Sequence, residues 1–188
     1  PLPALFACEL APTAPCGSTT TDYAWTRAAY GTPSSNTGPS SDHTSGSGSY
    51  MYVEADWPNS PNVGPFTLLS PTFDECVGEV NFYYHMYDYY NRYMGTLQLE
   101  ETTDGASWTT IWTKSGDQGN SWQGAAVSIS TVNVIRVRWV GTTGSGWRSD
   151  MAIDDVDILS EANSNGDCIV PTPAPSISPI PTAVPTLL

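Results

Sequence analysis

Eight short apolar segments between residues 49 and 159 constrain this chain more than any other feature. In each of them apolar and polar residues tend to alternate, and Gly, Pro, Asn or Asp lie at the boundaries. This pattern is typical of β-strands joined by turns, because alternate side chains of a strand point to opposite faces of a sheet. The segments are Ser49–Ala55, Phe66–Ser70, Glu79–Tyr87, Gly95–Thr102, Trp108–Ser115, Gln123–Ile129, Val134–Gly141 and Met151–Leu159. They predict an all-β fold, a two-sheet antiparallel β-sandwich with jelly-roll topology.

One pairing of these strands follows from a turn signal. The segment "TTDGAS" contains Asp104-Gly105, a dipeptide that favours tight hairpins. We therefore expect Gly95–Thr102 and Trp108–Ser115 to be antiparallel neighbours.

The length of the chain indicates one folded domain with tails. A chain of 188 residues can bury one hydrophobic core, whereas a second core would be cramped. Residues 169–188 carry proline at almost every second or third position, which predicts an extended polyproline II tail. We assign residues 1–7 to an incoming linker, residues 8–168 to the sandwich, and residues 169–188 to a Pro/Ser/Thr-rich linker or stalk of the composition found in O-glycosylated segments.

The charge of the chain limits its partners. Six Lys and Arg face 19 Asp and Glu, which gives a formal net charge of −13. Nucleic acid is therefore not an expected partner, because phosphate contacts need clustered cations. No apolar run is long enough to span a bilayer, so membrane association is expected only through other parts of a parent protein.

The four cysteines indicate an oxidising compartment. They form no C-x-x-C pair and have no histidine at zinc spacing, so we expect two disulfides rather than a zinc site. Of the three pairings, Cys8–Cys16 with Cys76–Cys168 is favoured, because the second bond would tie the terminal strand into the sheet. This composition predicts a secreted or cell-surface extracellular protein.

Tyrosine is concentrated in the stretch "FYYHMYDYYNRYMGTL", Phe82–Leu97. In the strand, alternation puts Val80, Phe82, Tyr84 and Met86 on one face, which we expect in the core, and His85 on the other. The turn that follows has tyrosine where ordinary turns use small polar residues. Core packing explains the strand but not the turn, so we predict an interface or glycan contact that involves Tyr83, Tyr87, Tyr89, Tyr90 and Tyr93.

Several segments together resemble the MAM domain, the extracellular module named after meprin, the A5 antigen (neuropilin) and receptor tyrosine phosphatase mu. In chain order they are "FACEL", "CG" at Cys16, "DYAWTR", "TGPSSDHTSGSGSYMYVEA", "LLSPTF", "VNFYYHMY", "MGTLQL", "IWTKSGDQGNSWQGAAV" and "DMAIDDVDI". The ordered set covers Cys8–Cys168. The resemblance implies a jelly-roll sandwich, the same disulfide pairing, and adhesion or assembly rather than catalysis. The chain departs from the family pattern at Ala24, which stands where Asp is usual before Trp25, and in its Tyr-rich turn.

One structural calcium ion is the cofactor that the resemblance implies. Glu9, Asp42 and Asp154 match acidic positions of the family's motifs, and hard carboxylate oxygens suit calcium. In "MAIDDVDIL", alternation places Asp154 on the same face as Ala152, Val156 and Ile158, which we expect in the core. A buried carboxylate needs either a cation or hydrogen-bond donors, and the sequence leaves both alternatives open.

These observations predict a non-catalytic extracellular module. It would mediate protein–protein contacts in a matrix, fibre or cell coat, with extracellular proteins or copies of itself as partners. The alternative is a carbohydrate-binding module that uses the Tyr-rich turn to contact glycans. A hydrolase is disfavoured, because "SSDHTSG" places Ser, Asp and His side by side in sequence, whereas catalytic triads are assembled from distant segments.

The disulfide pairing can be tested by peptide mapping. Digestion without reduction should release a Cys8–Cys16 peptide and a Cys76–Cys168 peptide, identified by mass spectrometry. A peptide that links Cys16 to Cys76 would contradict both the pairing and the topology.

Overall fold

A computed structural model describes residues 24–160 and 168, and these residues contain strands and no helix. Among them, therefore, no helix is long and apolar enough to cross a membrane. The strands are β1 (Thr26–Ala28), β2 (Tyr50–Val53), β3 (Phe66–Leu69), β4 (Val77–Met86), β5 (Thr96–Thr102), β6 (Thr109–Ser115), β7 (Gln123–Ser128), β8 (Arg136–Thr142) and β9 (Met151–Ser160).

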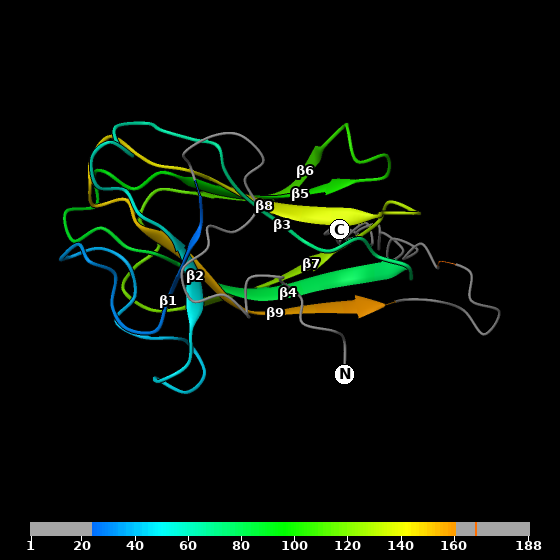
Figure 1. Ribbon diagram of the computed structural model, residues 1–188, viewed down its shortest axis with the longest axis horizontal. Coiled ribbons are helices and arrows are strands. Elements are labelled where there is room, and N and C mark those ends of the chain that lie inside the picture. The colour runs from blue at the N-terminus through cyan, green and yellow to red at the C-terminus, as the bar shows by residue number, and fades with distance from the viewer. Residues whose placement is uncertain (1–23, 161–167, 169–188) are drawn as a thin grey trace, which may run out of the picture.

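The strands form two antiparallel sheets that lie one above the other (Figure 1). One sheet has the order β1-β2-β9-β4-β7 and the other the order β3-β8-β5-β6. The chain crosses between the sheets from β3 to β4 to β5 and again from β7 to β8 to β9, as in a jelly roll. The predicted all-β sandwich is confirmed, and so is the β5–β6 pairing across Asp104-Gly105.

The core lies between the two sheets, and β4 shows how the sequence pattern fills it. Val80, Phe82, Tyr84 and Met86 are at most 4% exposed and pack against residues of the opposite sheet such as Trp139. The alternation that predicted this face is therefore confirmed. The other face of β4 points away from the core.

A β-bulge reverses the faces of β9. Val80 lies opposite Ile158 and Tyr84 lies opposite Ile153, and all four are core residues. In a regular strand, Ile153 and Ile158 would point to opposite faces, because their positions in the chain differ by an odd number. They share the core face because Asp155 and Val156 together lie opposite a single residue of β4. Asp155 has the left-handed backbone conformation at this point (φ 46°).

The prediction that Asp154 faces the core was therefore wrong. The bulge separates Asp154 and Ala152 from Val156 and Ile158, because strict alternation fails across an inserted residue. Asp154 pairs with Tyr83, and Ala152 belongs to a second cluster on the outer face with Tyr50 and Tyr52.

The sequence pattern missed β1. This strand is three residues long, lies at the edge of its sheet and is largely exposed, so it lacks an apolar alternation. Pairing with β2 defines it.

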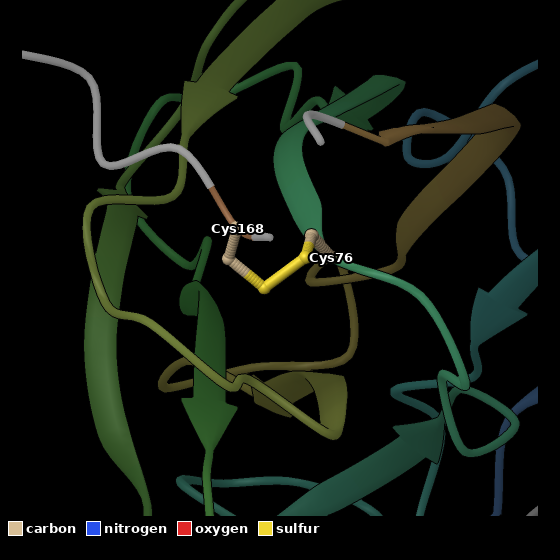
Figure 2. The surroundings of a disulfide bond; sticks show 2 residues. All are labelled: Cys76 and Cys168. Atoms are coloured by element: carbon tan, nitrogen blue, oxygen red, sulfur yellow. A yellow bond between two sulfur atoms is a disulfide. The ribbon is translucent and has the colours of Figure 1, made fainter. Parts of the chain in front are cut away.

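A disulfide joins Cys76 to Cys168 (Figure 2). Cys76 directly precedes β4, and Cys168 follows β9, so the bond connects the chain segments that enter and leave the paired central strands. This part of the predicted pairing is confirmed. Cys8 and Cys16, the linker at residues 1–7 and the Pro-rich residues 169–188 lie outside the described residues.

The loops gather at the two ends of the sandwich (Figure 1). At one end, hydrogen bonds connect the loop after β2 to the loop after β8, through Asn62 N to Gly144 O and Thr143 N to Val63 O. The β4–β5 loop joins them, since Ser145 Oγ donates to the Arg92 carbonyl. The Cys76–Cys168 disulfide lies at the opposite end of the strands, because Cys76 directly precedes β4 and Cys168 follows β9.

Candidate functional site

The Tyr-rich turn between β4 and β5 is held by a buried aspartate. The side chain of Asp88 is 1% exposed and accepts three backbone hydrogen bonds, from the amides of Tyr90 (3.1 Å), Arg92 (2.7 Å) and Tyr93 (2.8 Å). Its own amide donates to Asp117 Oδ1 at 2.9 Å. The carboxylate thus satisfies backbone donors that a turn of this shape would leave unpaired.

The tyrosines of this turn divide into two groups. Tyr89 is 62% exposed and Tyr90 is 50% exposed, with their ring centroids 5.1 Å apart at right angles. Tyr93 is half-buried, and its ring lies against Gly146, where a Cβ atom would come within 3.0 Å of it. Tyr93 therefore packs the turn onto the β8–β9 loop, whereas Tyr89 and Tyr90 face solvent.

An arginine extends this exposed surface to two tryptophans. The guanidinium of Arg148 lies 4.7 Å from the ring centroid of Tyr90 and 3.8 Å from that of Trp147, a cation–π arrangement on both sides. Trp147 and Trp57, which is 86% exposed, line one open cleft of about 530 Å³. We call the set formed by Trp57, Tyr89, Tyr90, Trp147 and Arg148 the aromatic rim.

The cleft also has polar walls. Ser34, Asp56 and Ser60 line it together with the two tryptophans. Apolar rings combined with a few polar groups are typical of ligand sites.

Two acidic residues, the half-buried Glu54 and the buried Asp150, support the loops around the cleft. Glu54 Oε1 accepts hydrogen bonds from Ser34 Oγ (3.3 Å) and from the amide of Asp56 (3.1 Å). Asp150, which is fully buried, accepts a hydrogen bond from the amide of Ala55 at 2.9 Å. The remaining oxygens, Glu54 Oε2 and Asp150 Oδ2, are buried without a hydrogen-bond donor among the described residues.

A proton on Asp150 would resolve this contact. Burial is the main cause that raises the pKa of Asp150 to about 8, and the charge of Glu54 is the second. The raised pKa favours the protonated form of Asp150, and a proton shared with Glu54 would give both buried oxygens a partner.

Of the predicted platform, Tyr83 and His85 lie on the outer face of β4, where other aromatic rings pack against them, and Tyr87 directly follows the strand. Tyr83 stacks on His43 with ring centroids 3.5 Å apart, and Trp122 packs edge-on against His85. His85 is 2% exposed, and its burial lowers its pKa to about 4, so the ring is neutral. Tyr83 and Tyr87 are half-buried here, and neither belongs to the aromatic rim.

Two of the three predicted calcium ligands lie close together. Asp154 Oδ2 accepts a hydrogen bond from the amide of His43 at 2.8 Å, next to Asp42 in the chain. Burial raises the pKa of Asp154 above its usual value, and the charges of Asp155 and Asp42 raise it further. A cation beside these carboxylates would offset that repulsion, so their chemistry fits calcium.

The same oxygens also have protein donors. Asp42 binds the amides of Ser45 (2.9 Å) and Gly48 (2.9 Å), and these bonds, with that of Ser45 as the main cause, lower its pKa. Among residues 24–160 and 168, no group of three His, Cys, Asp or Glu side chains is arranged to hold a metal ion. Glu9, the third predicted ligand, lies outside the described residues, and the calcium site stays a prediction.

Sequence analysis did not identify Trp57, Trp147 and Arg148 as site residues. Two signals were present, since "DWPNSP" and "GSGWRSD" each place a tryptophan among turn residues, where burial in a strand cannot account for it. The Glu54–Asp150 pair was also missed, because its two residues lie far apart in the chain. Such a pair requires the strand order before it can be inferred.

Comparison with known proteins shows which sequences this chain is similar to. The sequence profile of the MAM domain, meprin/A5/mu, matches residues 10–169. Neuropilin-1a of Danio rerio is 36% identical over 179 residues, covering 87% of this chain and 18% of the relative. MAM domain-containing glycosylphosphatidylinositol anchor protein 1 of Homo sapiens is 36% identical over 166 residues, covering 81% of this chain and 16% of the relative. The chain thus spans less than a fifth of the length of these relatives.

A solved structure shows the same kind of fold. The K1 cleaved adhesin domain of Lys-gingipain from Porphyromonas gingivalis W83 superposes with a TM-score of 0.50 and 15% sequence identity. The match covers 73% of this chain and 84% of that one. At this identity the likeness concerns the fold alone.

The acid pair predicts an unusual pH dependence of stability. Asp150 has a pKa of about 8 in the folded state and 3.8 as its ordinary value, so its contribution is present at low pH and is lost as pH rises through about 8. The slope would be at most about 1.4 kcal/mol per pH unit. In Asp150→Asn the amide can donate to Glu54 at every pH. Thermal unfolding between pH 5 and 8.5 should therefore show the variant gaining stability relative to the wild type as pH rises.

A matched control is Asp104→Asn. Backbone hydrogen bonds from Ser107 and Ala106 lower the pKa of Asp104 to about 2, so this residue is charged in both states throughout the pH range. Its loss should shift the melting temperature by a constant amount. A constant difference for Asp150→Asn as well would contradict the shared proton.

Calcium binding can be tested by chelation. If Glu9, Asp42 and Asp154 hold the ion, EDTA should lower the melting temperature and added calcium should restore it, because a ligand bound to the native state alone stabilises that state. An unchanged melting temperature would favour hydrogen bonding without metal.

Proposed function

Because the chain belongs to the MAM domain family, whose members are generally extracellular adhesion modules, we propose that it mediates protein–protein contacts in a matrix, fibre or cell coat through its aromatic rim. Its partners would be extracellular proteins or further copies of the chain. The relatives are much longer proteins, so this role is proposed for the module itself.

The observation that supports this proposal is the exposure of large aromatic side chains at one end of the sandwich. Trp57, Tyr89 and Tyr90 are each at least half-exposed, whereas most of the described aromatic side chains are buried or half-buried. Tyr30, which is 78% exposed, is a further exposed ring outside the rim. Exposed tyrosine, tryptophan and arginine are the residue types that contribute most to binding energy at protein interfaces.

The rigidity of the Tyr-rich turn favours binding as well. The hydrogen bonds to Asp88 fix the backbone before any partner arrives. Because the turn is already ordered, association costs less conformational entropy than it would with a flexible loop. The tyrosine rings thus form a preorganised contact surface.

A second candidate function is carbohydrate binding. The cleft between Trp57 and Trp147 favours it, because aromatic faces can stack on sugar rings while Ser34, Asp56 and Ser60 offer hydrogen bonds to hydroxyl groups. Anionic sugars are disfavoured by the net charge of −13, so the ligand would be a neutral glycan.

The adhesion proposal predicts the behaviour of Tyr89→Ser combined with Tyr90→Ser. Both side chains are largely exposed, so folding should be unaffected, whereas contacts through the rim should weaken at least about tenfold. The measurement is aggregation of beads coated with the full chain, together with retention of these beads on extracellular material of the source organism.

Val132→Ser provides the control. Val132 is 46% exposed and lies near Cys168, so it tests the loss of an exposed apolar residue at the opposite end. If this variant loses adhesion while the double tyrosine variant keeps it, the rim is not the contact surface. Retention on a neutral glycan array that depends on Trp57 would instead favour the second candidate.

A further inference from the structure

The cleft between Trp57 and Trp147 has the features of a groove for polyproline. Both indole rings are accessible, at 86% and 37% exposure. Within residues 24–160, neither indole N–H takes part in a hydrogen bond to another residue. Grooves that bind proline-rich segments combine aromatic ridges, which hold the pyrrolidine rings, with donors for the free carbonyls of the extended backbone.

The rest of the aromatic rim lengthens this groove. The guanidinium of Arg148 contacts the rings of both Trp147 and Tyr90, which restricts its movement. Tyr90 is joined through Arg148 to the tryptophans that line the cleft, so the exposed aromatic surface suits a peptide longer than a single residue.

The chain itself contains a segment of matching chemistry. Residues 169–188 have prolines at positions 171, 173, 175, 179, 181 and 185 and carry no charged side chain. Polyproline II has no internal hydrogen bonds, and its low entropy when free reduces the cost of binding. An uncharged segment also approaches an acidic domain without repulsion, whereas two acidic domains in direct contact repel each other.

The position of this segment favours binding to a neighbouring molecule. It follows Cys168, which is bonded to Cys76 at the start of β4, whereas the cleft is lined by loop residues near the start of β9, at the opposite end of this strand pair. Twenty residues of polyproline II extend about 60 Å, and returning along strands of ten residues would use about 33 Å, roughly half of that reach, before any contact with the cleft of the same molecule. A second molecule can receive the whole segment.

We propose that residues 169–188 of one copy bind the cleft between Trp57 and Trp147 of a second copy, so that the chains associate head to tail. This inference rests on the proposed function, since it names the partner of the same aromatic rim. A contact of this kind joins two different surfaces and therefore continues from copy to copy instead of closing as a symmetric dimer.

The test is a complementation experiment with two variants of the full chain. The cleft variant carries Trp57→Ala and Trp147→Ala and keeps the proline-rich segment. The tail variant carries Pro171→Ser, Pro173→Ser, Pro175→Ser, Pro179→Ser and Pro181→Ser and keeps the cleft. In sedimentation velocity, the wild type should form species that grow with concentration, and each variant alone should associate at least tenfold more weakly.

Mixing the two variants should restore binding but stop at a one-to-one complex, because only one pair of competent surfaces remains. If Trp147→Ala perturbs folding, Trp57→Ala alone should show the same loss, because Trp57 is almost fully exposed. The control is Leu159→Ala, which removes an exposed apolar side chain of β9 and should associate as the wild type does. The proposal is overturned by a mixture that stays monomeric, by a cleft variant that still associates, or by a wild type that remains monomeric at the highest attainable concentration.

The outcomes also separate this inference from the proposed function. If the tail variant still aggregates beads while the Tyr89→Ser and Tyr90→Ser variant does not, the rim is an adhesion surface whose partner is not the proline-rich segment. If both variants aggregate beads as the wild type does, the adhesion proposal and this inference both fail.

Discussion

The antiparallel pairing of β4 with β9 determines where everything else in this domain lies. These two ten-residue strands run through the five-stranded sheet side by side, and the disulfide joins the segments that flank them. At one end of the pair the chain enters and leaves β4 and β9 beside Cys76 and Cys168. At the other end it opens into the loops that form the aromatic rim. The disulfide and the aromatic rim lie at opposite ends of the pair, because the start of β4 lies beside the end of β9 and the end of β4 lies beside the start of β9.

The bulge in this pairing gives one strand two environments. Up to Ile153 the odd positions of β9 fill the core, and from Val156 onward the even positions do so. The inserted residue, Asp155, reaches His43 Nδ1 at 2.7 Å, and together with Asp154 it fixes the loop that covers the outer face. A departure from regular geometry thus anchors a long loop on a surface that regular strands would leave uncovered.

The sequence was sufficient for the parts of the fold that depend on local pattern. Alternation identified β2 to β9, and Asp104-Gly105 identified the β5–β6 hairpin. The bulge at Asp155 could not be predicted, because a left-handed residue inside an apolar pattern leaves no signal in the sequence. Two further features could not be predicted, because both depend on which loops the sheet order brings to the same end. They are the contact between Glu54 and Asp150 and the shared cleft of Trp57 and Trp147. Tyr89 and Tyr90 could be singled out, because a turn does not otherwise need exposed aromatic rings.

The hydrogen bonds of Asp88 have a consequence for how such a module can diversify. The carboxylate binds main-chain amides of the Tyr-rich turn, so the path of the backbone does not depend on which side chains stand at positions 89 and 90. Substitutions there change what the loop presents to its surroundings without a cost in folding. The turn therefore keeps its backbone conformation while its exposed side chains vary, so the domain can acquire a new binding specificity by changing very few codons.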